Sequence, residues 1–483
     1  MAVPTALSLP AVWAPPSAKC LQWSGDGQIL LVTRSAVYIL TPDAGVRVGA
    51  TSIIRQAPEL EDSQYGIKQL GWLRTMIEYD KTLAYYWPAE CQEWGTISLG
   101  SVDPTLRAVT PSPSNLTDNA CCLIAVLNSN MELTIWGPGR DQIRGKWTKF
   151  VDVTAYLRES LPQDSADNVL ARTLQAQATC IEWSPQADFN LSPTPKIDGS
   201  LLATGNRAGC VVLLRCLRDA TLNYAVSSVA VLPIVNRSLN HLAWSPWRTA
   251  DNTNGICEAY LACGAGDGSI TIVKVTQTLQ CTSSVTTNSE ITASVEIQDE
   301  LANEHDGRII TGMKWLYSPR RGPMLVYCKP GLLNLWSGDT AHDLWSGRRS
   351  FALETQKLCG GSSPLCPVSG IEYSTSKDSL VISLSDGSLH VLRSVSLEPQ
   401  WDNQFSDDGL AGPRMSAVAR AVFRQVEPET VQAKDVQSIY GMASYDGQGT
   451  YVWIHEYVGS HINSALTLTG LQRVSSDRLQ LQA

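Results

Sequence analysis

The chain has 483 residues, 43% of them hydrophobic, and a formal net charge of −9 at pH 7. This length fits two or three ordinary domains or one large closed domain, and the hydrophobic fraction excludes disorder of the whole chain. The acidic balance disfavours extensive direct contact with DNA, because nucleic-acid-binding domains usually carry a basic face.

Neither the N-terminus nor the cysteines indicate secretion. Residues 1–16 lack a basic n-region and are broken by prolines, and no segment approaches the roughly 18 uninterrupted apolar residues that span a bilayer. The 13 cysteines form no CxxC pair, and several lie in predicted strands, where cysteine behaves as a small apolar residue. We therefore expect an intracellular protein with buried free thiols and no contact with a membrane.

The first predicted element is the apolar segment Thr5–Trp13, just before the repeated part of the chain. Propeller rings are often closed by an N-terminal strand that completes the last blade, because closure removes exposed sheet edges. We expect Thr5–Trp13 to be that strand. The alternative is an arm that lies on the first blade.

The rest of the chain repeats one pattern, a short strand followed by a β-hairpin. The pattern is clearest where the short strand Leu242–Pro246 precedes a hairpin centred on Asp267-Gly268, a dipeptide that accepts the positive φ of a tight turn. Each such unit buries only one face and needs similar neighbours. The seven copies begin at Lys19, Thr105, Cys180, Leu239, Gly312, Gly370 and Ala421.

The spacing of the copies indicates a repeat architecture. The later hairpin turns lie near Asn206, Asp267, Pro330, Asp386 and Asp446, about 60 residues apart, against roughly 40–45 for a compact WD40 blade. The loops between strands must therefore be long. We predict an all-β, seven-bladed WD40-like β-propeller with long inter-blade insertions over residues 1–461, followed by a polar C-terminal tail or linker over 462–483.

An elaborated insert, residues 51–103, separates the first two blades and contains Trp72, Trp87 and Trp94. It is too long for a plain connection, so we expect the outer strand of blade one within it, near Trp94–Leu99. The remaining aromatic residues either pack on the ring or anchor a partner, because exposed Trp and Tyr dominate interface hot spots.

Two later segments and two arginine pairs are also notable. Val151–Leu174 is polar and partly helical in pattern, and Leu397–Met415 has the composition of a loop. The pairs Arg320-Arg321 and Arg348-Arg349 flank the hairpin of one copy, and we expect both pairs at one rim, where they would bind a partner. Together with Trp72, Trp87 and Trp94, these four arginines are the candidate partner-binding residues.

No residue constellation indicates catalysis. Gly264–Gly268 resembles a nucleotide-binding glycine loop, but a strand follows it instead of the helix that would supply amide donors to a phosphate. His241, His390 and His455 lie in strand-like runs and are expected to be structural. No paired carboxylates are visible. We therefore predict a protein that is not an enzyme, with no catalytic, metal-binding or cofactor-binding residue and no cofactor.

Several of these copies resemble a known family. The segments are Cys20–Pro42, Cys121–Pro138 with the following KWTKFVDVT, and Ile181–Gln186 with Leu201–Arg215. They resemble the N-terminal propeller of the delta-type WD40 subunit of transcription factor IIIC, in a fungal form. The resemblance covers most of the chain and is strongest from Lys19 to Val275.

The resemblance implies a non-catalytic nuclear scaffold for RNA polymerase III transcription. Its implied partners are the other transcription factor IIIC subunits, above all the second propeller subunit of the tau-B module that binds box B. The TATA-binding protein is a further implied partner, with indirect or minor DNA contact. Family members carry a C-terminal domain, with a zinc-binding element in some; this chain has no such cysteine cluster, which puts contacts of that domain in doubt.

Two other classes of function remain open at this stage. One is a WD40 adaptor of another nuclear complex, in chromatin or RNA processing. The other is an enzyme or an acetyltransferase-associated subunit; an acetyltransferase activity is attributed to an animal relative, but this sequence contains no acetyl-CoA loop. A catalytic propeller would need ionisable groups that converge at the strand ends of its central channel.

Overall fold

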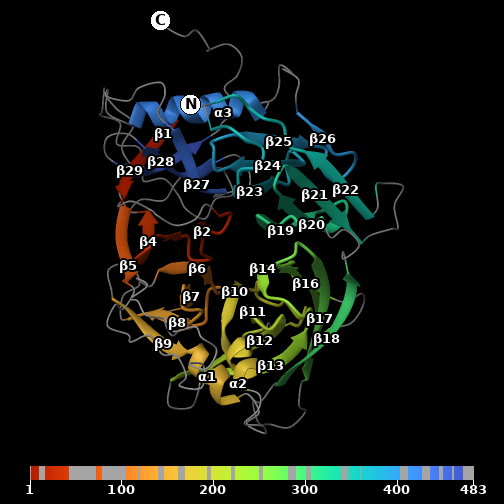
Figure 1. Cartoon of the computed structure of the whole chain (residues 1–483). Coiled ribbons are helices and arrows are strands. Elements are labelled where there is room, and N and C mark those ends of the chain that lie inside the picture. The colour runs from red at the N-terminus through yellow and green to blue at the C-terminus, as the bar shows by residue number, and fades with distance from the viewer. Residues whose placement is uncertain are drawn as a thin grey trace, which may run out of the picture.

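The computed structural model describes residues 2–9, 17–42, 72–78, 105–117, 120–139, 146–160, 169–192, 197–218, 223–249, 254–280, 290–300, 306–338, 345, 347–358, 361–402, 412–426, 436–444, 450–458 and 462–470. These residues form antiparallel sheets arranged around a central axis, with the innermost strand of each sheet facing that axis (Figure 1). The predicted all-β propeller is confirmed.

Seven sheets are present in this described part of the chain, numbered here in the order of their inner strands. Sheet 1 contains β2 (Leu21–Trp23), β3 (Ile29–Val32), β4 (Ala36–Pro42) and β5 (Trp72–Glu78). Sheet 2 contains β6 (Leu106–Pro111), β7 (Ile124–Asn128), β8 (Leu133–Pro138) and β9 (Trp147–Asp152). Sheet 3 contains β10 (Ala178–Trp183), β11 (Leu202–Asn206), β12 (Cys210–Arg218) and β13 (Tyr224–Pro233).

The next three sheets repeat this order. Sheet 4 contains β14 (Leu239–Trp244), β16 (Ile256–Ala265), β17 (Ile270–Gln280) and β18 (Glu290–Glu300), with the short β15 (Arg248–Thr249) paired to β16. Sheet 5 contains β19 (Gly312–Ser318), β20 (Gly322–Lys329), β21 (Leu332–Ser337) and β22 (Gly347–Ala352). Sheet 6 contains β23 (Val368–Ser374), β24 (Ser379–Leu384), β25 (Leu389–Arg393) and β26 (Gln400–Trp401).

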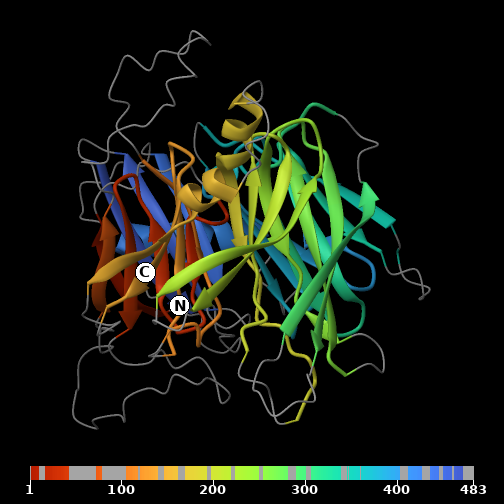
Figure 2. The ribbon, with the colours of Figure 1, turned by 90° about the horizontal axis from the view of Figure 1, so that it is seen from below.

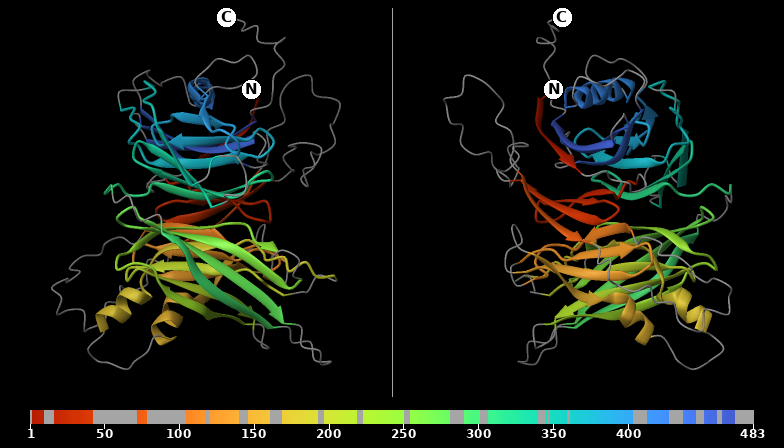
Figure 3. Two further views of the ribbon diagram at one scale, coloured as in Figure 1. Left: turned by 90° about the vertical axis from the view of Figure 1, so that its right-hand side faces the viewer. Right: turned by 60° about the vertical axis from the view of Figure 1, so that its left-hand side comes forward.

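Sheet 7 joins the two ends of the chain. It contains β27 (Val436–Ser444), β28 (Thr450–Val458), β29 (Ile462–Gly470) and the N-terminal β1 (Ala2–Leu9) as its outermost strand. The expected closure by an N-terminal strand is thus confirmed, although β1 begins and ends earlier than Thr5–Trp13. In the view of Figure 3, right, β1 runs alongside the strands of the last sheet.

The hydrophobic cores lie between neighbouring sheets. One cluster joins residues of sheets 7, 1 and 2, including Val452, Leu31 and Ile124. Further clusters join sheets 2 and 3, 3 and 4, 4 and 5, 5 and 6, and 6 and 7. The inner strands β2 and β27 are also in contact, so the first and last sheets are neighbours. Each sheet therefore depends on both of its neighbours for burial of its two faces.

Three helices lie outside the sheets in the described residues. Helices α1 (Val153–Ser160) and α2 (Val169–Ala176) connect sheets 2 and 3, in the segment expected to be partly helical. Helix α1 buries Val153 and Leu157, one turn apart, in the core between those sheets. Both helices stand beyond the strand ends at one edge of the ring (Figure 2, gold). Helix α3 (Gly412–Val426) packs Met415 and Ala419 against sheets 6 and 7.

The structure corrects three details of the sequence prediction. Ala421-Val422-Phe423, expected as the first strand of the last copy, lies in α3, where Pro413 at the helix start and an alanine-rich sequence favour a helix. The outer strand of sheet 1 is β5 and not Trp94–Leu99, which lies outside the described residues. The first nine residues of the expected tail form β29, because Leu466 and Leu468 alternate with Thr467 and Thr469 in the two-residue period of a strand.

The cysteines behave as expected wherever they are described. Among the described cysteines, all except Cys366 are buried. Burial raises the pKa of Cys20, Cys180 and Cys328 to about 12, so these thiols stay protonated at neutral pH. Among the helices of the described residues, none is long and apolar enough to cross a membrane.

Candidate protein-interaction surface

The ionisable side chains of the inner strands pair with one another across sheets. Lys19, just before β2, donates to the Glu182 carboxylate of sheet 3 at 2.5 Å and to the Leu242 carbonyl of sheet 4 at 2.6 Å. Lys314 of sheet 5 similarly donates to Glu372 of sheet 6 at 3.0 Å. These contacts tie sheets together around the axis, so the groups serve the packing of the ring.

The histidines singled out in the sequence lie in three different sheets, and His390 and His455 are buried, whereas His241 is half-buried. Burial lowers the pKa of His241 and His390 to about 4 and that of His455 to about 3, so all three are neutral at pH 7. The nearby charge of Lys19 lowers the pKa of His241 further, whereas Asp386 opposes the shift at His390. Across the described residues, no group of three or more His, Cys, Asp or Glu side chains could hold a metal ion.

The first arginine pair lies in the turn between β19 and β20. The turn closes with a hydrogen bond from the Arg321 amide to the Ser318 carbonyl, and Gly322 follows with a φ of 77°. Arg320 is exposed, but Arg321 is only 3% exposed, and its guanidinium lies 4.2 Å from the centroid of the Trp345 ring. The two adjacent arginines therefore have different environments, and only Arg320 faces solvent.

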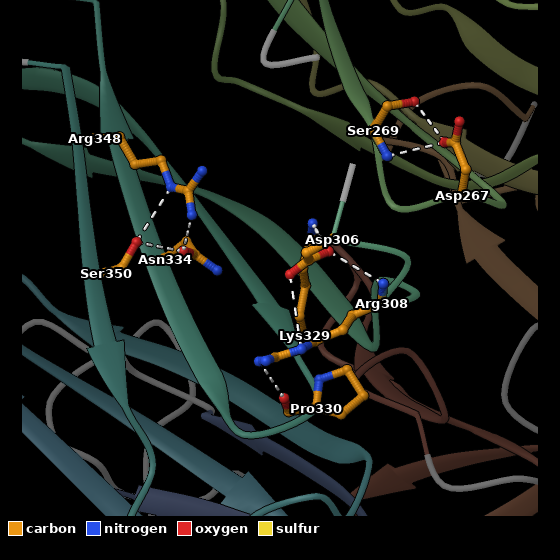
Figure 4. A network of polar contacts seen from close by, with 9 residues as sticks. All are labelled: Asp267, Ser269, Asp306, Arg308, Lys329, Pro330, Asn334, Arg348 and Ser350. Carbon is orange, nitrogen blue, oxygen red and sulfur yellow. Dashed lines mark hydrogen bonds and ion pairs between the residues drawn. The ribbon is translucent and has the colours of Figure 1, made fainter. Parts of the chain in front are cut away.

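The second pair lies at the start of β22, at the end of sheet 5 that also carries the turn between β19 and β20. Successive residues of a strand point to opposite faces, and Arg348 and Arg349 do so here. Arg348 donates to Asn334 Oδ1 at 3.0 Å and to Ser350 Oγ at 3.2 Å, which holds it against the sheet (Figure 4). Arg349 is exposed. The expected rim thus presents Arg320 and Arg349 most openly to solvent.

The structure adds one arginine that the sequence analysis did not select. Arg248 on β15 is exposed, and its Nη1 lies 3.5 Å from the position that a Cβ would take on Gly322. Sheet 4 therefore brings Arg248 beside the turn that carries Arg320. Arg248 is far from that turn in the sequence, and only the packing of sheet 4 against sheet 5 places them together. We call Arg248, Arg320 and Arg349 the basic rim.

Two carboxylates of the neighbouring strands form ion pairs with lysines. Glu258, opposite Arg248 in the strand register, pairs with Lys274 at 2.7 Å, and this bond raises the pKa of Lys274. The Glu372 carboxylate pairs with Lys314. An exposed aromatic, Tyr317, lies directly before the Ser318–Gly322 turn. The basic rim therefore combines exposed guanidinium groups with an aromatic ring, a combination common at protein interfaces.

The aromatic insert is only partly described. Trp72 lies at the start of β5 opposite Pro42, half-buried against the core shared by sheets 7, 1 and 2. Its strand is tied to sheet 2 by a hydrogen bond from Trp147 Nε1 to Thr75 Oγ1 at 3.1 Å. Trp72 thus contributes to packing in this structure. Trp87 and Trp94 lie outside the described residues.

The sheets define a β-propeller, and the basic rim lies at one end of two of its neighbouring sheets. The family model for the transcription factor IIIC subunit delta beta-propeller domain matches residues 23–455. The chain therefore belongs to this family, as the resemblance in its sequence indicated. Membership links the protein to transcription factor IIIC, which serves RNA polymerase III, and implies other subunits of that factor as partners.

Comparisons with solved structures and with curated protein sequences add nothing on function. A chain in the crystal structure of the mitotic checkpoint complex is similar at 12% identity and a TM-score of 0.46, over 97% of this chain and 92% of that chain. No curated protein sequence matches this one.

Proposed function

We propose that the protein is a non-catalytic scaffold subunit of transcription factor IIIC that acts in the nucleus. The match of the family model to residues 23–455 carries this proposal. In it, the propeller holds the second propeller subunit of the tau-B module and links box-B recognition to the TATA-binding protein, with indirect or minor DNA contact. The seven sheets would be the seven blades of one ring, a proposal supported by the contact between β2 and β27.

The basic rim is the surface that we propose for one of these contacts. Arg248, Arg320 and Arg349 come from two neighbouring sheets and are exposed, and an arginine fork binds carboxylates in a bidentate manner. Arg321 and Arg348 would stabilise this rim through their contacts with Trp345 and Asn334. Trp72, Trp87 and Trp94 remain proposed partner contacts of the aromatic insert.

Affinity purification tests this function. The tagged chain is expressed in its own cells, and co-purified proteins are identified by mass spectrometry, beside a variant carrying Arg248→Glu, Arg320→Glu and Arg349→Glu. Wild-type protein should recover transcription factor IIIC subunits, and the charge-reversed variant should recover at least one of them about tenfold less. Reversal of three rim charges typically weakens association by this much or more.

Arg107→Glu is the matched control, because Arg107 is exposed on sheet 2, away from the basic rim. A thermal melt of each variant checks that folding is unchanged. Recovery of chromatin or RNA-processing proteins without any transcription factor IIIC subunit would overturn the proposed function. Equal recovery by all variants would remove the basic rim from it and leave the scaffold role standing.

A further inference from the structure

Opposite the basic rim, at the other end of β20, two exposed apolar side chains flank one turn. Pro330 and Gly331 form the tight turn between β20 and β21, with a φ of 77° at Gly331. Leu365 is 63% exposed, more than any other large hydrophobic residue in the described part of the chain, and Ile309 is 54% exposed. A single exposed leucine is ordinary, but two exposed apolar side chains beside one turn form a patch.

Backbone and side-chain contacts place both residues beside this turn. The segment before β19 runs along β20, since the Thr311 amide donates to the Cys328 carbonyl at 2.8 Å, and Arg308 Nη1 donates to the Pro330 carbonyl at 3.4 Å. Ile309 therefore lies level with the turn on one side. On the other side, the Gly331 amide donates to the Pro364 carbonyl at 3.0 Å. The Leu365 Cδ2 lies 3.4 Å from the position that a Cβ would take on Gly331.

The turn itself is less polar than its neighbours. In sheets 4 and 6, Asp267 and Asp386 accept hydrogen bonds from the amide and hydroxyl of the serine two residues later. Sheet 5 has Pro330 in its turn, and the proline ring offers no polar side chain. The surface between the two aspartate-capped turns is consequently apolar at its centre.

The charges around this centre face solvent mainly as cations. Asp306 accepts a hydrogen bond from the buried Lys329 ammonium at 2.8 Å (Figure 4). Asp267 pairs with Arg237 at 3.3 Å. The guanidinium-bearing side chains of Arg308 and Arg237 are 48% and 66% exposed, whereas those of Asp306 and Asp267 are 30% and 16% exposed. A carboxylate that approached this surface would therefore meet guanidinium groups first.

We propose that Ile309, Pro330, Leu365 and Arg308, together the Pro330 surface, bind a partner-protein segment with apolar side chains next to carboxylates. Apolar side chains would cover Leu365 and Ile309, and a carboxylate would pair with Arg308. The inference rests on the proposed scaffold function only in expecting a protein partner. Because the Pro330 surface and the basic rim lie at opposite ends of sheet 5, one ring can hold two partners at once.

A phage-displayed peptide library is the probe. Selection on the full wild-type chain, with counter-selection on the Ile309→Asp, Leu365→Asp double variant, should enrich peptides that combine Leu, Ile, Phe or Trp with Asp or Glu. Fluorescence polarisation with the most enriched synthetic peptide then measures affinity. We expect at least a tenfold loss for Leu365→Asp and for Arg308→Glu. The control variant Val231→Asp should leave the peptide affinity unchanged, because Val231 lies on β13, in sheet 3. Its exposed fraction of 54% equals that of Ile309.

Three outcomes would overturn the proposal: enriched peptides without acidic residues, binding that Leu365→Asp leaves intact, or concentration-dependent dimerisation that Leu365→Asp abolishes. The last outcome would identify a second copy of the chain as the occupant. Leu365→Ser serves as the second variant if Leu365→Asp does not fold, and thermal melts decide this. Since no other transcription factor IIIC subunit enters the assay, its failure is distinguishable from failure of the proposed function.

Discussion

At the scale of single residues, identical side chains in adjacent positions have different roles. Arg320 and Arg321 have the same charge and cannot be ranked from the sequence. In the structure, Arg320 is exposed, whereas the Arg321 guanidinium is buried on the Trp345 ring. The sequence thus indicated both arginine pairs, but it selected neither Arg248 nor the members of each pair that face solvent.

Replacing Arg321 should therefore destabilise the fold. Arg321→Ala removes a desolvated cation–π contact and the packing of a long side chain, and we expect a loss of about 2 kcal/mol in the free energy of unfolding. Arg320→Ala should change this free energy by no more than about 0.5 kcal/mol, as is typical of exposed positions. Urea unfolding followed by tryptophan fluorescence measures both. Equal losses in the two variants would contradict the different environments described for them.

At the scale of elements, the hairpin signals predicted most strands well. Asp267-Gly268 and Asp386-Gly387 form the expected turns, with φ values of 84° and 87° at their glycines. The predictions failed where the pattern was short or ambiguous. Ala421-Val422-Phe423 alone suits a strand, and only its helical context and the packing of Met415 and Ala419 show that it belongs to α3.

Two turn glycines with a positive φ differ in what surrounds them, so substitutions there distinguish the cost of backbone strain from the cost of a steric clash. A Cβ on Gly268 would lie 2.0 Å from the Arg308 carbonyl oxygen at a φ of 84°, whereas a Cβ on Gly307 would meet nothing within 4 Å at a φ of 70°. Gly307→Ala should cost about 1 kcal/mol, from the left-handed conformation alone. Gly268→Ala should cost at least about 3 kcal/mol, because backbone must also move.

Thermal unfolding of both variants measures the difference. If the two melting temperatures fall by the same amount, the close approach of Arg308 to the Gly268 turn does not limit stability. A larger fall for Gly268→Ala would confirm that sheets 4 and 5 meet tightly at this turn.

At the scale of the whole molecule, histidines whose pKa is lowered in the folded chain should make stability depend on pH. The folded-state pKa of His241 and His390 is about 4, below the usual value of 6.5. Between these values the unfolded chain binds protons that the folded chain does not, so stability falls as pH decreases from about 6.5 towards 4. Each histidine should contribute a slope of up to about 1.4 kcal/mol per pH unit.

Urea unfolding at pH 7 and pH 5 measures this dependence. His241→Gln should reduce the loss of stability between these two values by about 1–2 kcal/mol, since glutamine takes up no proton. An unchanged loss would mean that His241 is protonated in the folded chain or that the sheets open around it before global unfolding.

The sequence by itself determined the local features of this protein: the strands, their tight turns, the buried thiols and the repetition that makes a propeller. These follow from two-residue periodicity and from turn residues, which act within a few positions of one another. The tertiary structure decided what lies side by side. It buried Arg321 on Trp345 and brought Arg248 beside the Gly322 turn. These outcomes depend on packing between sheets far apart in the chain, and no local pattern encodes that packing.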